Sequence, residues 1–172
     1  MKILVTGSRG FVGRNLVSQL HNIRDGKARN YGIAGEELTI YEYDMDSDPA
    51  ELDVYCRQAD FVFNLAGVNR PQDASEFMKG NFGFTSTLLD TLKKHGNTSP
   101  VMISSSTQAA LDNPYGESKR AGGNCCSSTP GKREQRYWCT ASRMFSANGA
   151  APTITARWPL SATTSPMTSP SG

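Results

Sequence analysis

A tyrosine and a lysine stand four positions apart in the segment Y-G-E-S-K, as Tyr115 and Lys119. On a helix this spacing brings both side chains to one face. A phenol with an ordinary pKa of about 10 is a poor acid or base at neutral pH, and a neighbouring ammonium group favours its ionised form. The pair could therefore transfer a proton to or from a substrate oxygen. Because Y-x-x-x-K is common in helices, the motif indicates catalysis only when the neighbouring elements support it.

A hydroxyl-rich segment precedes this pair and follows a short apolar run. Residues 100–104 read P-V-M-I-S, which predicts a strand, and Ser104, Ser105, Ser106 and Thr107 stand at its end. A hydroxyl group at such a strand end can hydrogen-bond the oxygen of a reacting carbonyl group. The sequence therefore predicts hydroxyl donors in the element next to the tyrosine–lysine pair.

A glycine-rich turn stands at the start of the chain. Gly7, Gly10 and Gly13 follow the apolar run of residues 3–5, and apolar residues then recur at helical spacing through residues 11–20. Glycine lets a pyrophosphate approach the main-chain N–H groups, and the helix N-terminus adds partial positive charge. A turn without a ligand is the alternative for an isolated pattern. This spacing between a buried strand and a helix favours dinucleotide binding.

Further strands and helices extend the same alternation. Residues 38–43 and 60–67 predict strands, residues 49–57 predict a short helix, and residues 75–95 predict a longer one. The second of these strands ends in N-L-A-G, where small residues let a cofactor lie close to the backbone. A plain strand exit fits the same residues equally well. Alternating strands and helices predict an α/β fold.

Together these motifs resemble the extended short-chain dehydrogenases, the NAD-dependent epimerase/dehydratase family. T-G-S-R-G-F-V-G is similar to the cofactor fingerprint of that family, N-L-A-G to its signature after the fourth strand, and Y-G-E-S-K to its catalytic pair. The resemblance covers residues 1–122. It implies a Rossmann-type parallel sheet flanked by helices, NAD(P) as the cofactor and, most often, nucleotide-sugar substrates.

The resemblance implies a set of cofactor contacts from the glycine turn, the strand ends, the long helix and the catalytic pair. These are Gly7, Arg9, Gly10, Phe11, Val12, Gly13, Asp44, Asn64, Leu65, Ala66, Gly67, Asn81, Ser104, Tyr115 and Lys119. Asp44 favours NAD, since an acidic residue at this strand end takes the ribose hydroxyls. Arg9 favours NADP, because a basic residue of this turn often meets the 2′-phosphate in the family. A solvated strand end and a solvated turn are the alternatives, and Arg9 leads us to expect NADP(H) over NAD(H).

The catalytic roles follow from the same resemblance. Tyr115 is expected to act as the acid/base and Lys119 to support it and to hold the nicotinamide ribose. Ser106 is expected to bond the reacting carbonyl oxygen, with Thr107 as the second candidate. Arg70 and Thr107 are candidates for substrate binding, although a surface arginine fits Arg70 equally well. Only residues 107–114 separate the serines from the tyrosine, which implies a reduced wall of the substrate pocket or a subfamily difference.

Two longer segments narrow the resemblance to a subfamily. G-V-N-R-P and S-S-S-T-Q-A-A-L-D-N-P-Y-G-E-S-K resemble the reductase domain of bacterial capsular-polysaccharide enzymes that serve UDP-N-acetyl-L-fucosamine synthesis. This implies NADPH-dependent reduction of the 4-keto group of a UDP-2-acetamido-2,6-dideoxy-hexose. It also implies a UDP-sugar as partner and a homodimer for full-length relatives. A nucleotide-sugar epimerase or dehydratase and a non-catalytic dinucleotide-binding fragment are the alternatives.

Composition and charge limit which other classes of protein the chain could belong to. The chain has 172 residues, enough for one domain with a core, and its net charge of +2 gives no electrostatic case for nucleic acid or membrane partners. No apolar run approaches the roughly 20 residues of a membrane span. Met1 leads directly into the first strand, so we expect no signal peptide and a cytoplasmic protein. The four cysteines lack C-x-x-C spacing, so we expect no metal site and no disulfide framework.

The composition changes after Gly122. Residues 123–172 hold both tryptophans and several prolines in a run of Ser, Thr and Ala, with no helical or alternating pattern. A polar disordered tail is one interpretation. A shifted reading frame is the sharper one, because decoding residues 124–170 one base earlier permits an amphipathic helix, a glycine turn and the strand T-V-L-V-Y.

We therefore divide the chain into a Rossmann domain at residues 1–122 and an irregular, out-of-frame tail at residues 123–172. On this hypothesis the sheet is incomplete in its C-terminal half, and the catalytic helix ends near residues 122–124. No further central strand is expected. Sheet surface left uncovered should make the product marginally stable, and its activity should be impaired.

Overall fold

Strands and helices alternate along the chain in the computed structural model, which describes residues 1–28, 38–68, 73, 75–106, 112–127, 137–142 and 155–157. The elements in chain order are β1 (Lys2–Thr6), α1 (Phe11–Arg24), β2 (Thr39–Tyr43), α2 (Pro49–Gln58), β3 (Phe61–Asn64), α3 (Ser75–Phe77), the π-helix η1 (Met78–Gly83), α4 (Phe84–Lys94), β4 (Val101–Ser106), α5 (Pro114–Ser127), β5 (Tyr137–Ser142) and β6 (Thr155–Arg157).

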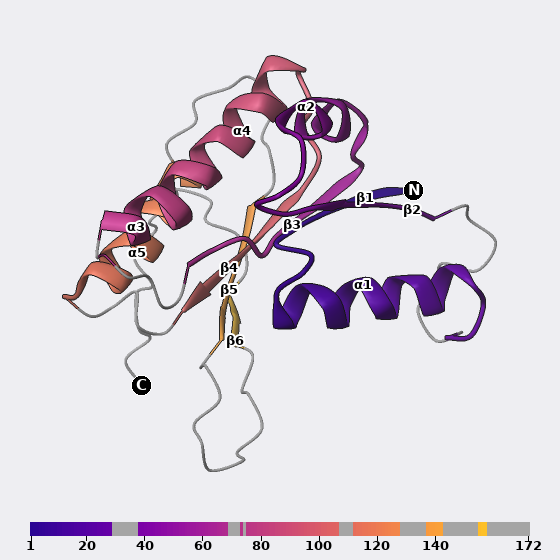
Figure 1. Ribbon diagram of the computed structural model, residues 1–172, viewed down its shortest axis with the longest axis horizontal. Coiled ribbons are helices and arrows are strands. Elements are labelled where there is room, and N and C mark those ends of the chain that lie inside the picture. The colour runs from indigo at the N-terminus through magenta and orange to yellow at the C-terminus, as the bar shows by residue number, and fades with distance from the viewer. Residues whose placement is uncertain are drawn as a thin grey trace, which may run out of the picture.

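These strands form one sheet in the order β2-β1-β3-β4-β5-β6 (Figure 1). Neighbouring strands from β2 to β5 pair in parallel, and β6 pairs with β5 in the antiparallel sense. The order reverses at β1, because the chain moves outward to β2 and then returns across β1 to β3. In doubly wound sheets, ligands bind at such a reversal, beyond the carboxyl ends of the two strands. The confirmed fold is therefore a Rossmann-type parallel sheet flanked by helices.

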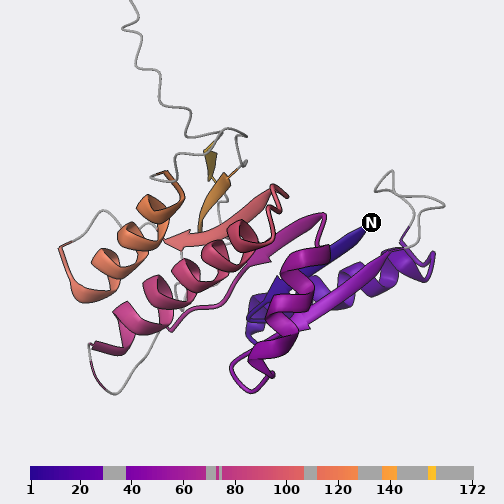
Figure 2. The same cartoon turned by 90° about the horizontal axis from the view of Figure 1, so that it is seen from above.

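Helices cover the two faces of the sheet unequally. The helix α1 lies on one face, whereas α2, α4 and α5 lie on the other, with α4 and α5 side by side (Figures 1 and 2). The core under α2 and α4 includes Leu4, Val62 and Leu88, which are fully buried. On the α1 face, Phe61 and Phe63 are only half-buried. Covering both faces matters here because parallel strands are apolar on each side.

Local sequence explains where the helices begin. The helix α2 starts after Asp48, whose carboxylate accepts a hydrogen bond of 2.8 Å from the Ala50 N–H, and Pro49 occupies the first turn. An acidic N-cap followed by proline satisfies an orphan donor and presets the first backbone angle. The predicted short helix is thus confirmed.

Within the described residues, no helix is long and apolar enough to cross a bilayer.

Two features differ from the sequence-based expectations. The long helix expected at residues 75–95 is interrupted by the π-helix η1, which contains Asn81. The helix α5 runs to Ser127 instead of ending near residues 122–124, and β5 extends the sheet beside β4, so the expectation of no further central strand was wrong. Tyr137–Ser142 contains aromatic residues and threonine that favour a strand, and the edge of β4 offers it backbone partners.

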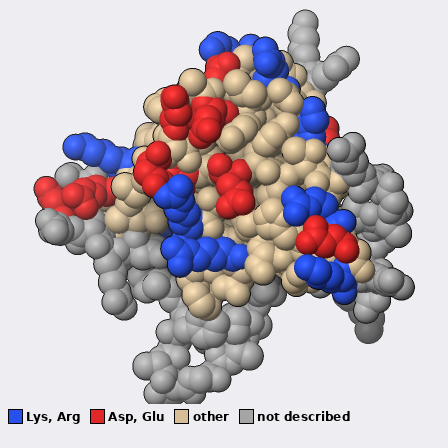
Figure 3. Space-filling view, turned by 45° about the vertical axis from the view of Figure 1, so that its right-hand side comes forward, with Lys and Arg blue, Asp and Glu red and all other residues tan. Residues whose placement is uncertain are grey.

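Charged side chains of both signs are interspersed over the described part of the face shown in Figure 3. This mixture accords with the small net charge of +2. Among the described residues, no group of three or more His, Cys, Asp or Glu side chains is arranged to hold a metal ion.

Candidate active site

The glycine turn after β1 packs backbone to backbone against the end of β3. Gly7 has a φ of +69°, and a Cβ atom there would lie 2.7 Å from the Ala66 nitrogen. A Cβ atom on Gly13 would lie 2.1 Å from the Gly7 carbonyl oxygen. Glycine is therefore required at Gly7 by both conformation and space, and at Gly13 by space alone.

The N-terminus of α1 lies beside this turn and could hold an anionic group such as a pyrophosphate. Its N-cap is Gly10, and no side chain caps the helix. Phe11 and Val12 in its first turn are 72% and 60% exposed. A helix N-terminus that no side chain caps offers N–H groups and partial positive charge to an anion. Gly10 at the N-cap has no side chain, and a Cβ atom there would meet only the Gly7 carbonyl oxygen, at 3.3 Å.

Arg9 and Asp44 lie together at the outer end of this turn. The Arg9 backbone N–H donates a hydrogen bond of 2.7 Å to the Asp44 carboxylate. The Arg9 guanidinium forms an ion pair with Asp46, a contact between two exposed side chains. The sequence analysis missed Asp46, because nothing in the local pattern shows that a residue 37 positions away meets Arg9.

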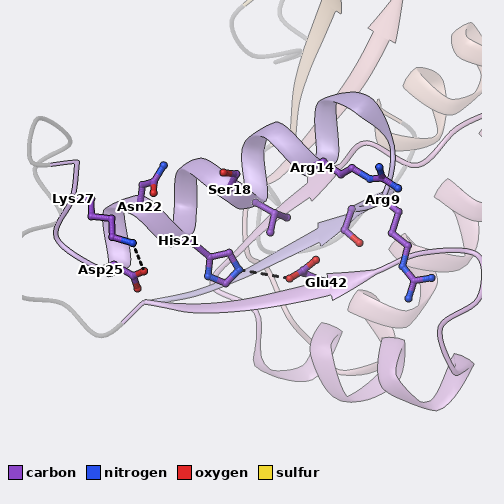
Figure 4. Close-up of a pocket in the computed structure, with 10 residues that line it drawn as sticks. Arg9, Arg14, Ser18, His21, Asn22, Asp25, Lys27 and Glu42 are labelled. Atoms are coloured by element: carbon purple, nitrogen blue, oxygen red, sulfur yellow. Dashed lines mark hydrogen bonds and ion pairs between the residues drawn. The ribbon is translucent and has the colours of Figure 1, made fainter.

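An open pocket of about 510 Å³ lies between α1 and β2 next to Arg9 (Figure 4). Arg9 and Arg14 lie at one end of it, and Asp25 and Lys27 at the other. Tyr115 and Lys119 do not line this pocket. It therefore adjoins the glycine turn and is not the place where the tyrosine and lysine could react.

The end of β3 meets the helix α5 at Gly67. A Cβ atom on Gly67 would lie 2.6 Å from the Asn81 Oδ1 atom and 2.9 Å from the Lys119 Nζ atom. Asn81 is 4% exposed and exchanges hydrogen bonds with the backbone of Val68, accepting at 2.9 Å and donating at 3.2 Å. The structure thus brings together the residues expected from N-L-A-G, the long helix and the catalytic pair.

Tyr115 and Ser106 meet at the carboxyl end of β4. Burial raises the pKa of the Tyr115 phenol above its ordinary value of 10.0, and a side-chain hydrogen bond between Ser106 and the phenol opposes part of that rise. The Lys119 Nζ atom lies 5.9 Å from the centre of the Tyr115 ring, and the Phe77 ring packs edge-on at 5.4 Å. The upward shift of the pKa favours the protonated phenol, which is the form that can donate a proton.

Some of the remaining candidate site residues lie farther from Tyr115 and Lys119, and others fall outside the described residues. Ser104 is half-buried within β4, and Leu65 and Ala66 follow β3 beside the glycine turn. Arg70 and Thr107, the two candidates for substrate binding, lie outside the described residues. Their roles stay predictions.

Two buried hydroxyl groups near the site were missed by the sequence analysis. Ser118 is fully buried and accepts a hydrogen bond of 2.9 Å from the Asn81 side chain. Thr85 is 3% exposed and donates one of 2.7 Å to the Asn81 carbonyl oxygen. Their positions, three residues after Tyr115 and four after Asn81, were the available signal, since both spacings point along one helix face.

Comparison with known proteins places these features in a family. The sequence model of the NAD dependent epimerase/dehydratase family matches residues 3–153. A UDP-2-acetamido-2,6-beta-L-arabino-hexul-4-ose reductase from Pseudomonas aeruginosa is 41% identical over 121 residues, which are 70% of this chain and 29% of that protein.

Solved structures agree on the fold. The capsular polysaccharide assembling protein CapF from Staphylococcus aureus matches with a TM-score of 0.55 and 37% identity, over 72% of this chain and 30% of that one. A short-chain dehydrogenase/reductase superfamily protein from Agrobacterium tumefaciens, solved with bound NAD, matches with a TM-score of 0.63 and 20% identity, over 81% and 48%. The chain spans less than a third of the Pseudomonas and Staphylococcus relatives.

Proposed function

Because this chain belongs to the NAD dependent epimerase/dehydratase family, we propose that it serves the NAD(P)H-dependent reduction of a nucleotide sugar. The substrate is the 4-keto form of a UDP-2-acetamido-2,6-dideoxy-hexose, in capsule or surface-polysaccharide biosynthesis. The activity named for the Pseudomonas relative supports this substrate class. The observation that carries the proposal is that Tyr115, Ser106 and Lys119 lie close together at the carboxyl ends of the strands. The glycine turn lies at the same end of the sheet, where it packs against the segment that leads to Gly67 and Lys119.

Each of these side chains has a distinct part in the reaction. Tyr115 donates its phenolic proton to the carbonyl oxygen while the carbonyl carbon accepts a hydride, so that the C=O group becomes CH–OH. Ser106 hydrogen-bonds the same oxygen and supports the negative charge that develops on it. Lys119 holds a positive charge near the phenol, which stabilises the phenolate left after proton transfer.

The glycine turn and the N-terminus of α1 would hold the pyrophosphate of the cofactor, and Asn64 to Gly67 would lie along its adenosine side. When bound, the reduced nicotinamide supplies the hydride. For the finer choice we propose NADP(H), since Arg9 can meet a 2′-phosphate. Its ion pair with Asp46 and the neighbouring Asp44 oppose that choice, because a phosphate would have to displace or tolerate these carboxylates.

Several wider expectations belong to this proposal. A UDP-sugar is the partner, the setting is cytoplasmic, and full-length relatives form homodimers. An epimerase or dehydratase of the same family stays the second candidate, because it would use the same cofactor turn and the same tyrosine–lysine pair.

We also propose that residues 1–122 form the functional Rossmann unit and that residues 123–172 are specified by a shifted reading frame. The change of composition after Gly122 supports this division. Sequencing the coding DNA across residues 122–124 tests it. An added or missing base that restores the decoded string would support the division, and confirmation of the frame as written would end it.

Replacing Tyr115 with phenylalanine tests the catalytic proposal. Loss of the proton donor in Tyr115→Phe should lower turnover of the 4-keto UDP-sugar by at least about 100-fold. The Kd for NADPH should stay within about threefold, because the ring and its packing are kept. Tyr55→Phe is the matched control, since that phenol lies on α2 and its ring stacks on Tyr41 at 4.5 Å.

The outcomes separate the candidates. If the wild-type chain and Tyr115→Phe bind the cofactor and neither turns over, the chain is a dinucleotide-binding module. If Tyr115→Phe turns over like the wild-type chain, the assigned proton donor is wrong. If no dinucleotide binds, the cofactor proposal fails.

A further inference from the structure

Five buried polar side chains form a row that crosses the interior from β1 to α5. We call it the polar row, and its members are Thr6, Asn64, Thr85, Asn81 and Ser118. All of them are between 0% and 4% exposed. A buried polar side chain is costly unless it is hydrogen-bonded, so five in succession require an explanation.

Each member donates a hydrogen bond to the next one. The Thr6 hydroxyl donates to Asn64 Oδ1 at 2.8 Å, and the Asn64 amide donates to the Thr85 hydroxyl at 3.1 Å. The Thr85 hydroxyl then donates to the Asn81 carbonyl oxygen at 2.7 Å.

The second half of the row runs in the same sense and reaches the catalytic helix. The Asn81 amide donates to the Ser118 hydroxyl at 2.9 Å, and that hydroxyl donates to the Tyr115 carbonyl oxygen at 2.7 Å. All five bonds therefore point from β1 toward α5. At Asn81 the row passes from backbone to side chain, because the carbonyl oxygen accepts the bond from Thr85 and the side-chain amide donates the next one. Hydrogen bonds that share a group polarise one another, so the bonds within each half depend on their neighbours, and Asn81 joins the two halves.

The polar row connects the two halves of the proposed site, the glycine turn and the helix that carries Tyr115. Thr6 immediately precedes Gly7, the first residue of the glycine turn, and the far end is the backbone of Tyr115 itself. The π-helix η1 holds Asn81 at the bend of the row, where its side chain also fixes the backbone of Val68. Such π-turns occur often at functional sites.

We propose that Thr85 and Ser118 are positioning residues that couple the glycine turn to the catalytic helix. Occupation of the turn is transmitted along the polar row and steadies Tyr115 and Lys119 in their reactive positions. This inference rests on the proposed function, because it assumes that a dinucleotide occupies the turn. It assigns a role to two side chains that touch neither cofactor nor substrate.

ADP is a suitable probe, because it can fill the turn but has no nicotinamide that would contact α5 directly. Hydrogen exchange of the α5 backbone is measured by mass spectrometry on the full chain, with and without saturating ADP. The variants are Thr85→Val, which keeps the shape and removes the hydroxyl, and Ser118→Ala. Thr85→Ser restores a hydroxyl. Thr87→Val is the matched control, because the exposed Thr87 hydroxyl makes the same kind of bond to Gly83 at 3.0 Å outside the row.

In the wild-type chain, ADP should slow exchange in α5 by about tenfold. Thr85→Val and Ser118→Ala should still bind ADP, with a Kd within about threefold of the wild-type value, but should lose the slowing in α5. Thr85→Ser and Thr87→Val should keep it. Retention of the slowing in both row variants, or its equal loss in Thr87→Val, would overturn the inference.

If the wild-type chain binds no ADP, that result counts against the proposed function and not against the polar row. A second measurement, which needs no cofactor, then tests the polar row by itself. The urea midpoint is compared for Thr85→Val, Ser118→Ala and the double variant. If the bonds act as one row, the double variant shifts the midpoint by clearly less than the sum of the single shifts. Strictly additive shifts would show separate bonds and would overturn the inference.

Discussion

The glycine turn after β1 and the helix α5 reach the same edge of the sheet, but they are held there by different means. The turn is fixed by close backbone contacts that exclude any side chain, since a Cβ atom added to Gly13 would lie only 2.1 Å from the Gly7 carbonyl oxygen. The helix is fixed by side-chain hydrogen bonds through Asn81 and Ser118. Gly7 and Gly13 of the turn should therefore accept no side chain, whereas the second region should respond in proportion to the bond that is lost.

The largest effect should come from Gly13→Val in the turn. A valine side chain has no space beside the Gly7 carbonyl, so the turn and α1 must separate and cofactor binding should fall below detection. Isothermal titration with NADPH measures this. Gly83→Ala is the control, because a Cβ atom there would lie at an ordinary 3.8 Å from the Met78 carbonyl oxygen. Normal binding by Gly13→Val would break the contrast between the two regions.

A smaller but still large effect is expected from Lys119→Met on α5. Loss of the ammonium group beside Tyr115 should lower turnover by about 100-fold, since the phenolate is no longer stabilised. The Kd for NADPH should rise only about tenfold or less, because the turn is intact. Steady-state kinetics and titration separate the two quantities. Arg120→Met, whose charge lies at the surface opposite Asp112 at 3.5 Å, should behave like the wild-type chain.

Ser106→Ala should change the pH dependence of the reaction. The reduction needs the neutral phenol, so its rate holds at low pH and falls as the pH rises through the pKa of Tyr115. Burial already raises that pKa above 10.0 and the Ser106 bond opposes the rise, so Ser106→Ala should move the alkaline limb to still higher pH. A pH–rate profile measures the shift, with Ser105→Ala as control because it faces away. A limb that moves to lower pH would contradict the assignment.

The smallest effect is expected from Arg9→Gln at the rim of the turn. Its pair with Asp46 is exposed, so the free energy of unfolding should change by less than about 1 kcal/mol. Affinity for NADPH should fall several-fold while affinity for NADH is kept. An equal loss for both dinucleotides would show that Arg9 does not meet the 2′-phosphate.

The same contrast explains what the sequence could predict. The glycine spacing and the tyrosine–lysine spacing are local, so both appear in the printed chain, and the Rossmann-type fold followed from them. The polar row is not local, because Asn81 meets a residue 37 positions away and Thr6 one 58 positions away. The π-helix also escaped prediction, since the apolar residues around it keep helical spacing. Pairing of β5 with β4 depends on an available sheet edge and not on a pattern within residues 137–142.

The central claim is that the two regions together direct a hydride and a proton to one carbonyl group. Incubation of the chain with the 4-keto UDP-sugar and cofactor deuterated at its transferable position tests this most directly, with the product followed by NMR. The account predicts a 4-hydroxy sugar with deuterium on C4 and oxidised cofactor in equal amount, and far slower labelling in Tyr115→Phe. Cofactor that binds and stays reduced while the sugar remains a ketone, or a product without deuterium on C4, would contradict it.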